Sequence, residues 1–256
     1  MAAQIMTQRL REEHDAAVHL TTARVYPHLE LVRLHGYRDD HQNLPTSASL
    51  SVNIQDRERG GTHGRCHVDA TVATSDKFVR DRMWVNGEEV AVDNQTSRLA
   101  KTMHEARRGG QRFSSAKCHI AVAHDLPPGC GLGIDDLAHT AVLMAACRLL
   151  RSQEDCGGGA QATGACVSET QMRAQRSLNG GAVRSLVGGV VRLGRGYRED
   201  GKDCFPVPVF DADHWPELVV LAVVPCGAEE PPRGAHEAAM RRGVDTSALL
   251  SHRAGV

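Results

Sequence analysis

A glycine-rich loop between an apolar run and a helical pattern is the feature that most constrains this chain. The loop spans residues 127–133 and reads Pro-Pro-Gly-Cys-Gly-Leu-Gly; the apolar run before it is 118–123 and the helical pattern after it is 136–151. A strand, a glycine loop and a helix in this order are the layout of a phosphate cradle. Glycines let backbone N–H groups approach an anion closely, and the helix N-terminus adds about half a positive charge. The loop is therefore a candidate phosphate site.

The residues that follow the glycines argue against a phosphate site. Ile134, Asp135 and Asp136 stand where hydroxyls or a lysine would contact phosphate oxygens. Each carboxylate would oppose phosphate binding by about 1 kcal/mol in water, and only a bridging Mg²⁺ would reverse that sign. The glycine pattern also lacks the acid of a Rossmann site and the P-loop lysine. An ordinary helix start, with Asp135 as N-cap and Asp136 in the first turn, explains the same residues.

Composition bounds the class of protein. At 256 residues the chain can hold one large domain or two smaller ones, and 41% hydrophobic with 24% charged residues is typical of a soluble globular protein. A net charge of −1 gives no general attraction to nucleic acid or anionic membrane. The longest apolar run, 218–224, is too short to span a bilayer, and the N-terminal residues lack a signal-peptide core. We expect a cytoplasmic protein without nucleic-acid or membrane partners.

The cysteines and histidines give no metal or redox motif. The eight cysteines include no C-x-x-C pair, so reduced thiols are expected. Cys66-His67 and Cys118-His119 are neighbours in sequence. Neighbours on a strand point to opposite faces, so neither pair can act as nucleophile and base.

Strand and helix patterns alternate along the chain. Strand patterns cover 21–34, 47–54, 67–74, 118–123, 188–193, 205–210 and 218–224. Helical patterns cover 1–17, 95–107, 136–151 and 236–242. Residues 82–90 predict a hairpin, because Asn86-Gly87 supplies the positive φ angles of a type I′ turn. Residues 152–175 have low hydrophobicity and three successive glycines, which predicts a flexible surface insertion.

Five collinear blocks resemble segments of a known family. Residues 184–224 contain Arg-Ser-Leu-Val-Gly-Gly, then Asp-Gly-Lys-Asp, then His-Trp-Pro-Glu-Leu; the other blocks are 35–54, 81–90, 126–136 and 240–250. They are similar to segments of diphosphomevalonate decarboxylase, of the GHMP small-molecule kinase superfamily. The resemblance implies an α+β fold: a GHMP kinase-like N-terminal βαβ lobe, with the second, C-terminal lobe missing.

The same resemblance divides the chain into three expected parts. Residues 1–17 are a polar N-terminal extension, and residues 18–225 are the GHMP kinase-like N-terminal lobe, with 152–175 inserted in it. Residues 226–256 match the truncated start of a C-terminal lobe. In the family the substrate cleft lies between the two lobes.

The implied activity is ATP- and Mg²⁺-dependent decarboxylation of mevalonate diphosphate to isopentenyl diphosphate, in isoprenoid and sterol precursor synthesis. ATP phosphorylates the tertiary hydroxyl of the substrate, and phosphate and carbon dioxide then leave. Catalysis of this kind consists mostly of positioning and of neutralising polyphosphate charge.

The resemblance also assigns roles to particular residues. Arg184 matches the arginine that holds the substrate carboxylate and diphosphate, a role that suits a planar guanidinium fork, so it is the expected catalytic residue. The other residues implied to bind substrate are Arg33, Tyr37, Asn179 and Gly181. The residues implied to bind nucleotide are Gly129, Gly131, Leu132, Gly133 and Asp135. No residue is assigned to a metal.

Several of these positions depart from the family pattern. Substrate-contacting serines are replaced by Asn179 and Gly181, and nucleotide-loop serines by Ile134 and Asp135. Tyr37 replaces a lysine, and no Asp of this chain matches the family's catalytic aspartate, which lies in the second lobe. Losing transition-state groups and phosphate contacts together slows a reaction by several powers of ten. We expect weak or no activity; the alternative is a pseudoenzyme that pairs, as a homodimer or with a full-length relative.

Overall fold

The computed structural model describes residues 18–34, 36–54, 66–90, 117–126, 132–150, 172, 176, 182–211 and 213–215. Strands and helices are mixed in this part of the chain, which confirms the expected α+β class. The strands are β1 (His19–Val25), β2 (His28–Val32), β3 (Tyr37–Asp39), β4 (Leu44–Pro45), β5 (Ser49–Asn53), β6 (Val68–Thr74), β7 (Arg82–Val85), β8 (Glu88–Val90), β9 (Cys118–His124), β10 (Val190–Leu193) and β11 (Pro206–Phe210). The helices are α3 (Ile134–Leu150) and the short 3₁₀ helix η1 (Ala182–Leu186).

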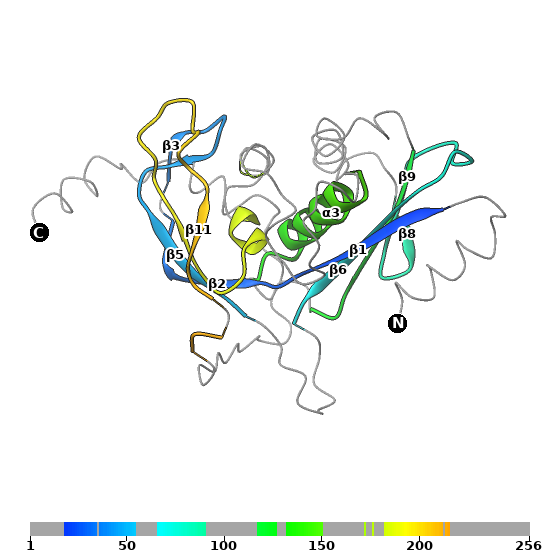
Figure 1. Cartoon of the computed structure of the whole chain (residues 1–256), viewed down its shortest axis with the longest axis horizontal. Coiled ribbons are helices and arrows are strands. Elements are labelled where there is room, and N and C mark those ends of the chain that lie inside the picture. Colours follow the sequence, from blue (N-terminus) through cyan, green and yellow to red (C-terminus); the bar gives the residue numbers. More distant parts are fainter. Residues whose placement is uncertain are drawn as a thin grey trace, which may run out of the picture.

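The larger sheet has five strands in the order β1-β6-β9-β7-β8. Its pairs are antiparallel except β7 and β9, which run parallel. Val68, Ala70 and Val72 of β6 are fully buried, and because alternate strand residues share a face they make one apolar face of the sheet. α3 packs against β1 and β6, as Figure 1 shows.

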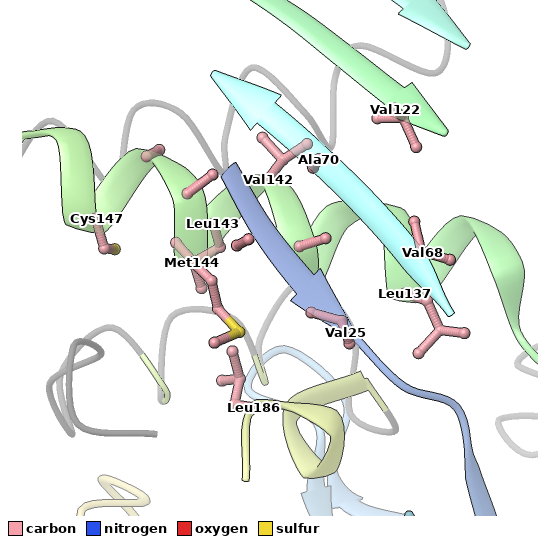
Figure 2. Packing of buried hydrophobic residues seen from close by; sticks show 14 of the residues in the cluster. Val25, Val68, Ala70, Val122, Leu137, Val142, Leu143, Met144, Cys147 and Leu186 are labelled. Carbon is pink, nitrogen blue, oxygen red and sulfur yellow. The ribbon is translucent and has the colours of Figure 1, made fainter. Parts of the chain in front are cut away.

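The main core lies between this sheet and α3. Residues 141–147 of α3 are all buried, which is expected for a helix covered on more than one side. In Figure 2, Leu137 lies beside Val68, while Met144 points toward Leu186 of η1. Each large aliphatic side chain buried here contributes about 1.5–3 kcal/mol.

The smaller sheet has four antiparallel strands in the order β11-β10-β5-β2, so β2 and β11 are its edges. β3 and β4 form a separate two-stranded pair. η1, yellow-green in Figure 1, lies between α3 and the smaller sheet and contacts both α3 and β10. η1 therefore connects the main core to the second sheet.

Most of the predicted elements that fall on described residues are confirmed. The strand predictions at 47–54, 67–74, 118–123, 188–193 and 205–210 correspond to β5, β6, β9, β10 and β11. The hairpin at 82–90 is β7–β8, with φ angles of 51° at Asn86 and 90° at Gly87. Among the described residues, no helix has the length and apolar character to cross a membrane.

Two boundaries were predicted wrongly. The single strand at 21–34 is two strands of different sheets, β1 and β2, separated at Tyr26 and Pro27; proline lacks the N–H that a continuous ladder needs. α3 begins at Ile134, two residues before the predicted start. The elements predicted at 1–17, 95–107, 218–224 and 236–242, and the 152–175 insertion apart from Met172, lie outside the described residues.

Candidate functional site

η1 presents Arg184 toward the second sheet. Val183 and Leu186 on either side of it are fully buried, and Leu186 meets Met144 of α3 in the main core. These apolar contacts fix η1 against α3. Since η1 lies between α3 and the second sheet, the Arg184 side chain reaches β2 and β5.

The guanidinium of Arg184 is bound by two side chains of that sheet. Its Nη2 forms an ion pair with Glu30 Oε1 of β2 at 2.5 Å, and its Nη1 donates to Ser49 Oγ of β5 at 3.2 Å. The Arg184 side chain is 2% exposed, so its charge is held away from water. A buried guanidinium needs such partners, because an unpaired buried charge is strongly destabilising.

Glu30 joins a second cation to this site. Its Oε2 lies 3.5 Å from Nε of Arg33, whose side chain is mostly exposed. The structure thus brings together Arg33 and Arg184, two of the predicted substrate residues, on one carboxylate. Sequence reasoning did not single out Glu30; the available signal was an acidic residue between two leucines on an apolar strand.

His28 completes the neighbourhood of Arg184. Its Nδ1 lies 2.9 Å from Ser185 Oγ, on the same 3₁₀ helix as Arg184. Burial, and then the nearby charge of Arg184, lowers the pKa of His28 to about 3. The imidazole is therefore neutral near pH 7, and the charged side chains of this cluster within the described part of the chain are Arg184, Arg33 and Glu30.

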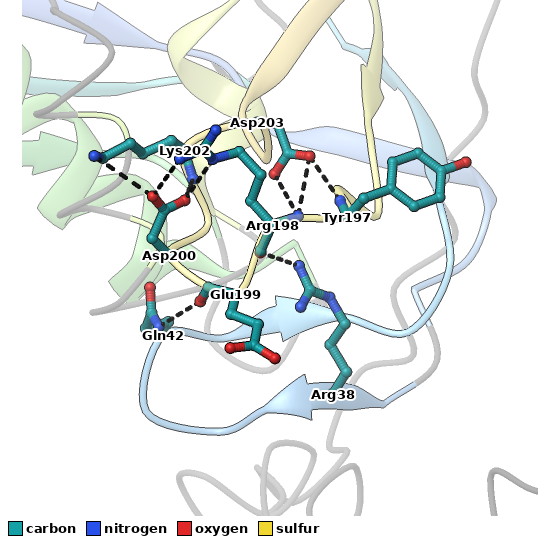
Figure 3. Close-up of polar contacts among 8 residues, drawn as sticks. All are labelled: Arg38, Gln42, Tyr197, Arg198, Glu199, Asp200, Lys202 and Asp203. Carbon is teal, nitrogen blue, oxygen red and sulfur yellow. Dashed lines mark hydrogen bonds and ion pairs between the residues drawn. The ribbon is translucent and has the colours of Figure 1, made fainter.

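A second polar cluster, shown in Figure 3, holds the loop at 194–204. The carboxylate of Asp203 accepts the backbone N–H groups of Tyr197 and Arg198, and Arg38 Nη2 donates to the Arg198 carbonyl at 2.8 Å. Asp200 pairs with the Arg198 side chain at 2.8 Å. The Asp-Gly-Lys-Asp block that carried part of the resemblance therefore shapes this loop through its two aspartates.

The same region contains a fully buried arginine that sequence reasoning also missed. Arg176 donates to the backbone carbonyls of Gln42, Gly201 and Cys204, the first two at 3.0 and 3.1 Å. Asn43 Nδ2 in turn donates to the Arg176 carbonyl at 2.9 Å. These bonds connect the β3–β4 turn to the 194–204 loop.

The remaining predicted substrate residues are placed only in part. Tyr37 is half-buried at the first position of β3 and pairs with Pro45. Asn179 and Gly181 lie outside the described residues.

The described part of the predicted nucleotide loop fits a bare polyphosphate poorly. Gly133 has φ 65°, and its carbonyl accepts the N–H of Leu137, so the helix starts directly after it. Asp135 lies in the first turn of α3 beside Asp136, not at the N-cap as predicted, because α3 begins at Ile134. Two carboxylates there oppose a polyanion. Leu132 is half-buried at the loop's end, while Gly129 and Gly131 lie outside the described residues.

The described residues also hold no group of three or more His, Cys, Asp or Glu side chains suited to a metal. Cys118 and His119 lie on opposite faces of β9, as expected: Cys118 belongs to the main core, and His119 stacks on Phe78 at 3.7 Å between ring centroids. This confirms that the adjacent pair cannot work as nucleophile and base.

Comparison with known proteins gives one consistent group. A family model for the diphosphomevalonate decarboxylase-like N-terminal domain matches residues 25–206. The diphosphomevalonate decarboxylase of Bos taurus is 33% identical over 239 residues, which are 88% of this chain and 53% of the relative. The chain thus spans about half the length of the curated relatives it matches.

Solved structures share the fold. A crystal structure of mevalonate diphosphate decarboxylase from Staphylococcus aureus has a TM-score of 0.58 and 22% identity, covering 78% of this chain and 52% of that one. A structure described as the mevalonate diphosphate mediated ATP binding mechanism of the Enterococcus faecalis enzyme has a TM-score of 0.57 and 19% identity, covering 78% and 54%. At these identities the likeness establishes the fold.

Proposed function

The chain belongs to the diphosphomevalonate decarboxylase-like family, and from this we propose that it is a decarboxylase homologue with weak or no turnover of mevalonate diphosphate of its own. The family reaction belongs to isoprenoid and sterol precursor synthesis, and a cytoplasmic location is part of the same proposal. Arg184 is the residue proposed to face the substrate carboxylate and diphosphate.

The Arg184–Glu30 ion pair is the observation that carries the proposal. A guanidinium that binds a substrate anion must offer its N–H groups to that anion. Here Nη2 is engaged by Glu30 and Nη1 by Ser49. An incoming carboxylate or diphosphate has to compete with a carboxylate that is covalently part of the chain.

The start of α3 supports the same proposal on the nucleotide side. In the family, ATP with Mg²⁺ supplies the phosphoryl group. Asp135, which stands where the resemblance has a serine, and Asp136 put two carboxylates in the first turn of α3, where a polyphosphate would approach the helix N-terminus. We therefore assign no step to bound nucleotide in this chain.

Calorimetry and a turnover assay test the proposal together. The purified full chain is titrated with Mg²⁺-ATP and, separately, with mevalonate diphosphate, and phosphate and carbon dioxide release are followed with both present. We expect no saturable micromolar binding of ATP and turnover several powers of ten below that of a full-length family enzyme assayed alongside. Turnover within tenfold of that enzyme would overturn the proposal.

A second function, pairing with another chain of the family, is favoured by the outer face of β2. Leu29, Leu31 and Val32 on this edge strand are 41%, 51% and 44% exposed. Clustered exposed aliphatic side chains are typical of contact surfaces. Light scattering after gel filtration tests this: Leu31→Lys should shift a dimer toward monomer, whereas Val79→Lys, at a position 90% exposed in a loop, should not. A monomer at all concentrations, alone and with a full-length relative, would contradict pairing.

A further inference from the structure

Glu30 lies on β2, between the exposed aliphatic residues Leu29 and Leu31, and its carboxylate points the other way, to Arg184. In the antiparallel ladder Glu30 is opposite Ser51, and Ser49 lies two residues from Ser51, hence on the same face. Glu30 and Ser49 therefore approach Arg184 from the same side of the second sheet.

We propose that Arg184, Ser49 and Arg33 form a small-anion site whose occupant is the Glu30 side chain of the same chain. Free carboxylate or diphosphate anions then bind there only when Glu30 is removed or displaced. The inference rests on the proposed function, since it explains the proposed weak activity: the Glu30 carboxylate occupies the position that an anionic group of the substrate would take.

The geometry and charge of the cluster support an occupied site. One Glu30 oxygen faces Arg184 and the other faces Arg33, so a single carboxylate spans both cations. With His28 neutral, the described residues Arg184, Arg33 and Glu30 contribute two positive charges and one negative charge. Removing Glu30 takes away this shared carboxylate, and an external anion would then pair with the two guanidinium groups in its place.

The site is also reachable from solvent. The Glu30 side chain is 24% exposed and that of Arg33 61%, while Arg184 itself is almost fully enclosed. An anion can therefore approach from the side of Glu30 and Arg33 without opening the core behind η1. This arrangement predicts that truncating Glu30 gives an external anion access to the Arg184 guanidinium, whereas truncating an acidic residue elsewhere does not.

Calorimetric titration of the full chain with inorganic pyrophosphate tests the inference. The unaltered chain should bind pyrophosphate weakly, and Glu30→Ala should bind it about 30-fold more tightly, because charge-assisted hydrogen bonds to Arg184 become available to the ligand. Glu88→Ala, at an exposed acidic position on β8, is the matched control and should behave like the unaltered chain. Adding Arg184→Met to Glu30→Ala should remove the gain, because the anion loses its buried partner.

Thermal unfolding keeps the test decisive where Glu30→Ala folds poorly. Acetate should raise the melting temperature of Glu30→Ala, or restore its folded circular dichroism signal, and leave the unaltered chain unchanged. Glu30→Gln keeps the size of the side chain without its charge, and it should gain pyrophosphate affinity to a smaller degree.

Two results would overturn the inference. One is unchanged pyrophosphate affinity in both Glu30 variants, with no acetate rescue; the other is tight binding by the unaltered chain that Arg184→Met abolishes. Neither depends on turnover. Efficient decarboxylation by the unaltered chain would instead refute the proposed function, so the two failures are told apart by separate measurements.

Discussion

The two sheets of this chain bury different kinds of side chain. Between the larger sheet and α3 most buried residues are aliphatic, alanine, methionine or cysteine, and buried Thr140 donates to the Asp136 carbonyl of its own helix. Beside the smaller sheet and its loops, Arg176 and Arg184 are among the largest fully buried side chains. Burial of apolar surface stabilises the first region. In the second region, the buried polar groups need hydrogen-bond or ion-pair partners, because burying them without partners is costly.

This difference sets how each region responds to substitution. In the apolar region the loss of unfolding free energy on substitution should scale with the side-chain volume removed, because neighbouring residues relax only partly around a cavity. In the polar region the same loss should scale with the number of buried donors and acceptors that no longer have a hydrogen-bond partner. The two regions should therefore respond differently to core substitution, to acid and to replacement of glycine.

The largest effect is expected for truncation inside the apolar region. Leu143→Ala, at a fully buried position of α3, should lower the free energy of unfolding by about 4 kcal/mol, because it removes buried methyl groups and leaves a cavity. Urea unfolding followed by circular dichroism measures it. Val79→Ala, at an exposed position, is the control and should cost less than about 0.5 kcal/mol. Similar losses at both positions would refute the core assignment.

Removing the buried guanidinium of Arg176 should cost about 3 kcal/mol, because Arg176→Met keeps an apolar stem but leaves three carbonyls without this donor. The same unfolding measurement applies. Arg192→Met, at an exposed position of β10, is matched in chemistry and should change little. Equal values for the two variants would mean that the carbonyl contacts do not stabilise this region.

A smaller loss of unfolding free energy is expected when the pH is lowered. As the pH falls, the polar region should lose stability before the apolar region does. The pKa of His28 is lowered from its ordinary 6.5 to about 3 by burial and Arg184, so the unfolded chain binds the extra proton between these values. The His28 contribution is therefore present above pH 6.5 and is lost as pH falls toward 3. Unfolding free energy should decrease by about 2 kcal/mol between pH 7 and 4.5 on account of this residue.

The control for this pH effect is Asp69 of β6, on the face of the larger sheet opposite the Val68, Ala70 and Val72 side chains. Burial alone would raise the pKa of Asp69, but hydrogen bonds from His67 and Arg24 outweigh it and hold the pKa below its ordinary 3.8. Its contribution is lost only below that value, outside the pH 7 to 4.5 window. A His28→Asn variant should therefore flatten the difference across this window. An unchanged slope in that variant would assign the acid sensitivity elsewhere.

Sequence pattern predicts strands of both sheets, including β5, β10 and β11 of the smaller one, and the helix that covers the larger one. β6, β9 and α3 follow from runs and spacings of apolar residues, and the β7–β8 hairpin follows from Asn86-Gly87. Each of these signals is local, within about 20 residues. The break between β1 and β2 was missed because both flanks have strand character and only the sheet assignment separates them.

The polar region depends on contacts that no local pattern contains. Arg184 was found through resemblance, but its pairing with Glu30 required the register of β2 beside β5. His28 and Ser185 meet across 157 residues, and Arg176 meets Gln42 across 134. The sequence alone also does not distinguish a buried arginine from a surface one, and most arginines are exposed. Glu30 could therefore be named only once the strands were paired.

The smallest effect separates two glycines that share a positive φ. Gly87, in the β7–β8 turn, has no neighbour within reach of an added Cβ, whereas a Cβ on Gly201 would meet Arg176 Nη2 at 2.5 Å and Leu44 Cδ2 at 2.7 Å. Gly87→Ala should cost about 1 kcal/mol of backbone strain. Gly201→Ala adds to that strain the displacement of a guanidinium fixed by three carbonyls, so it should cost about 1 kcal/mol more. If chemical unfolding gave the same loss for both, Arg176 would be free to shift, and the polar region would be as tolerant as a surface turn.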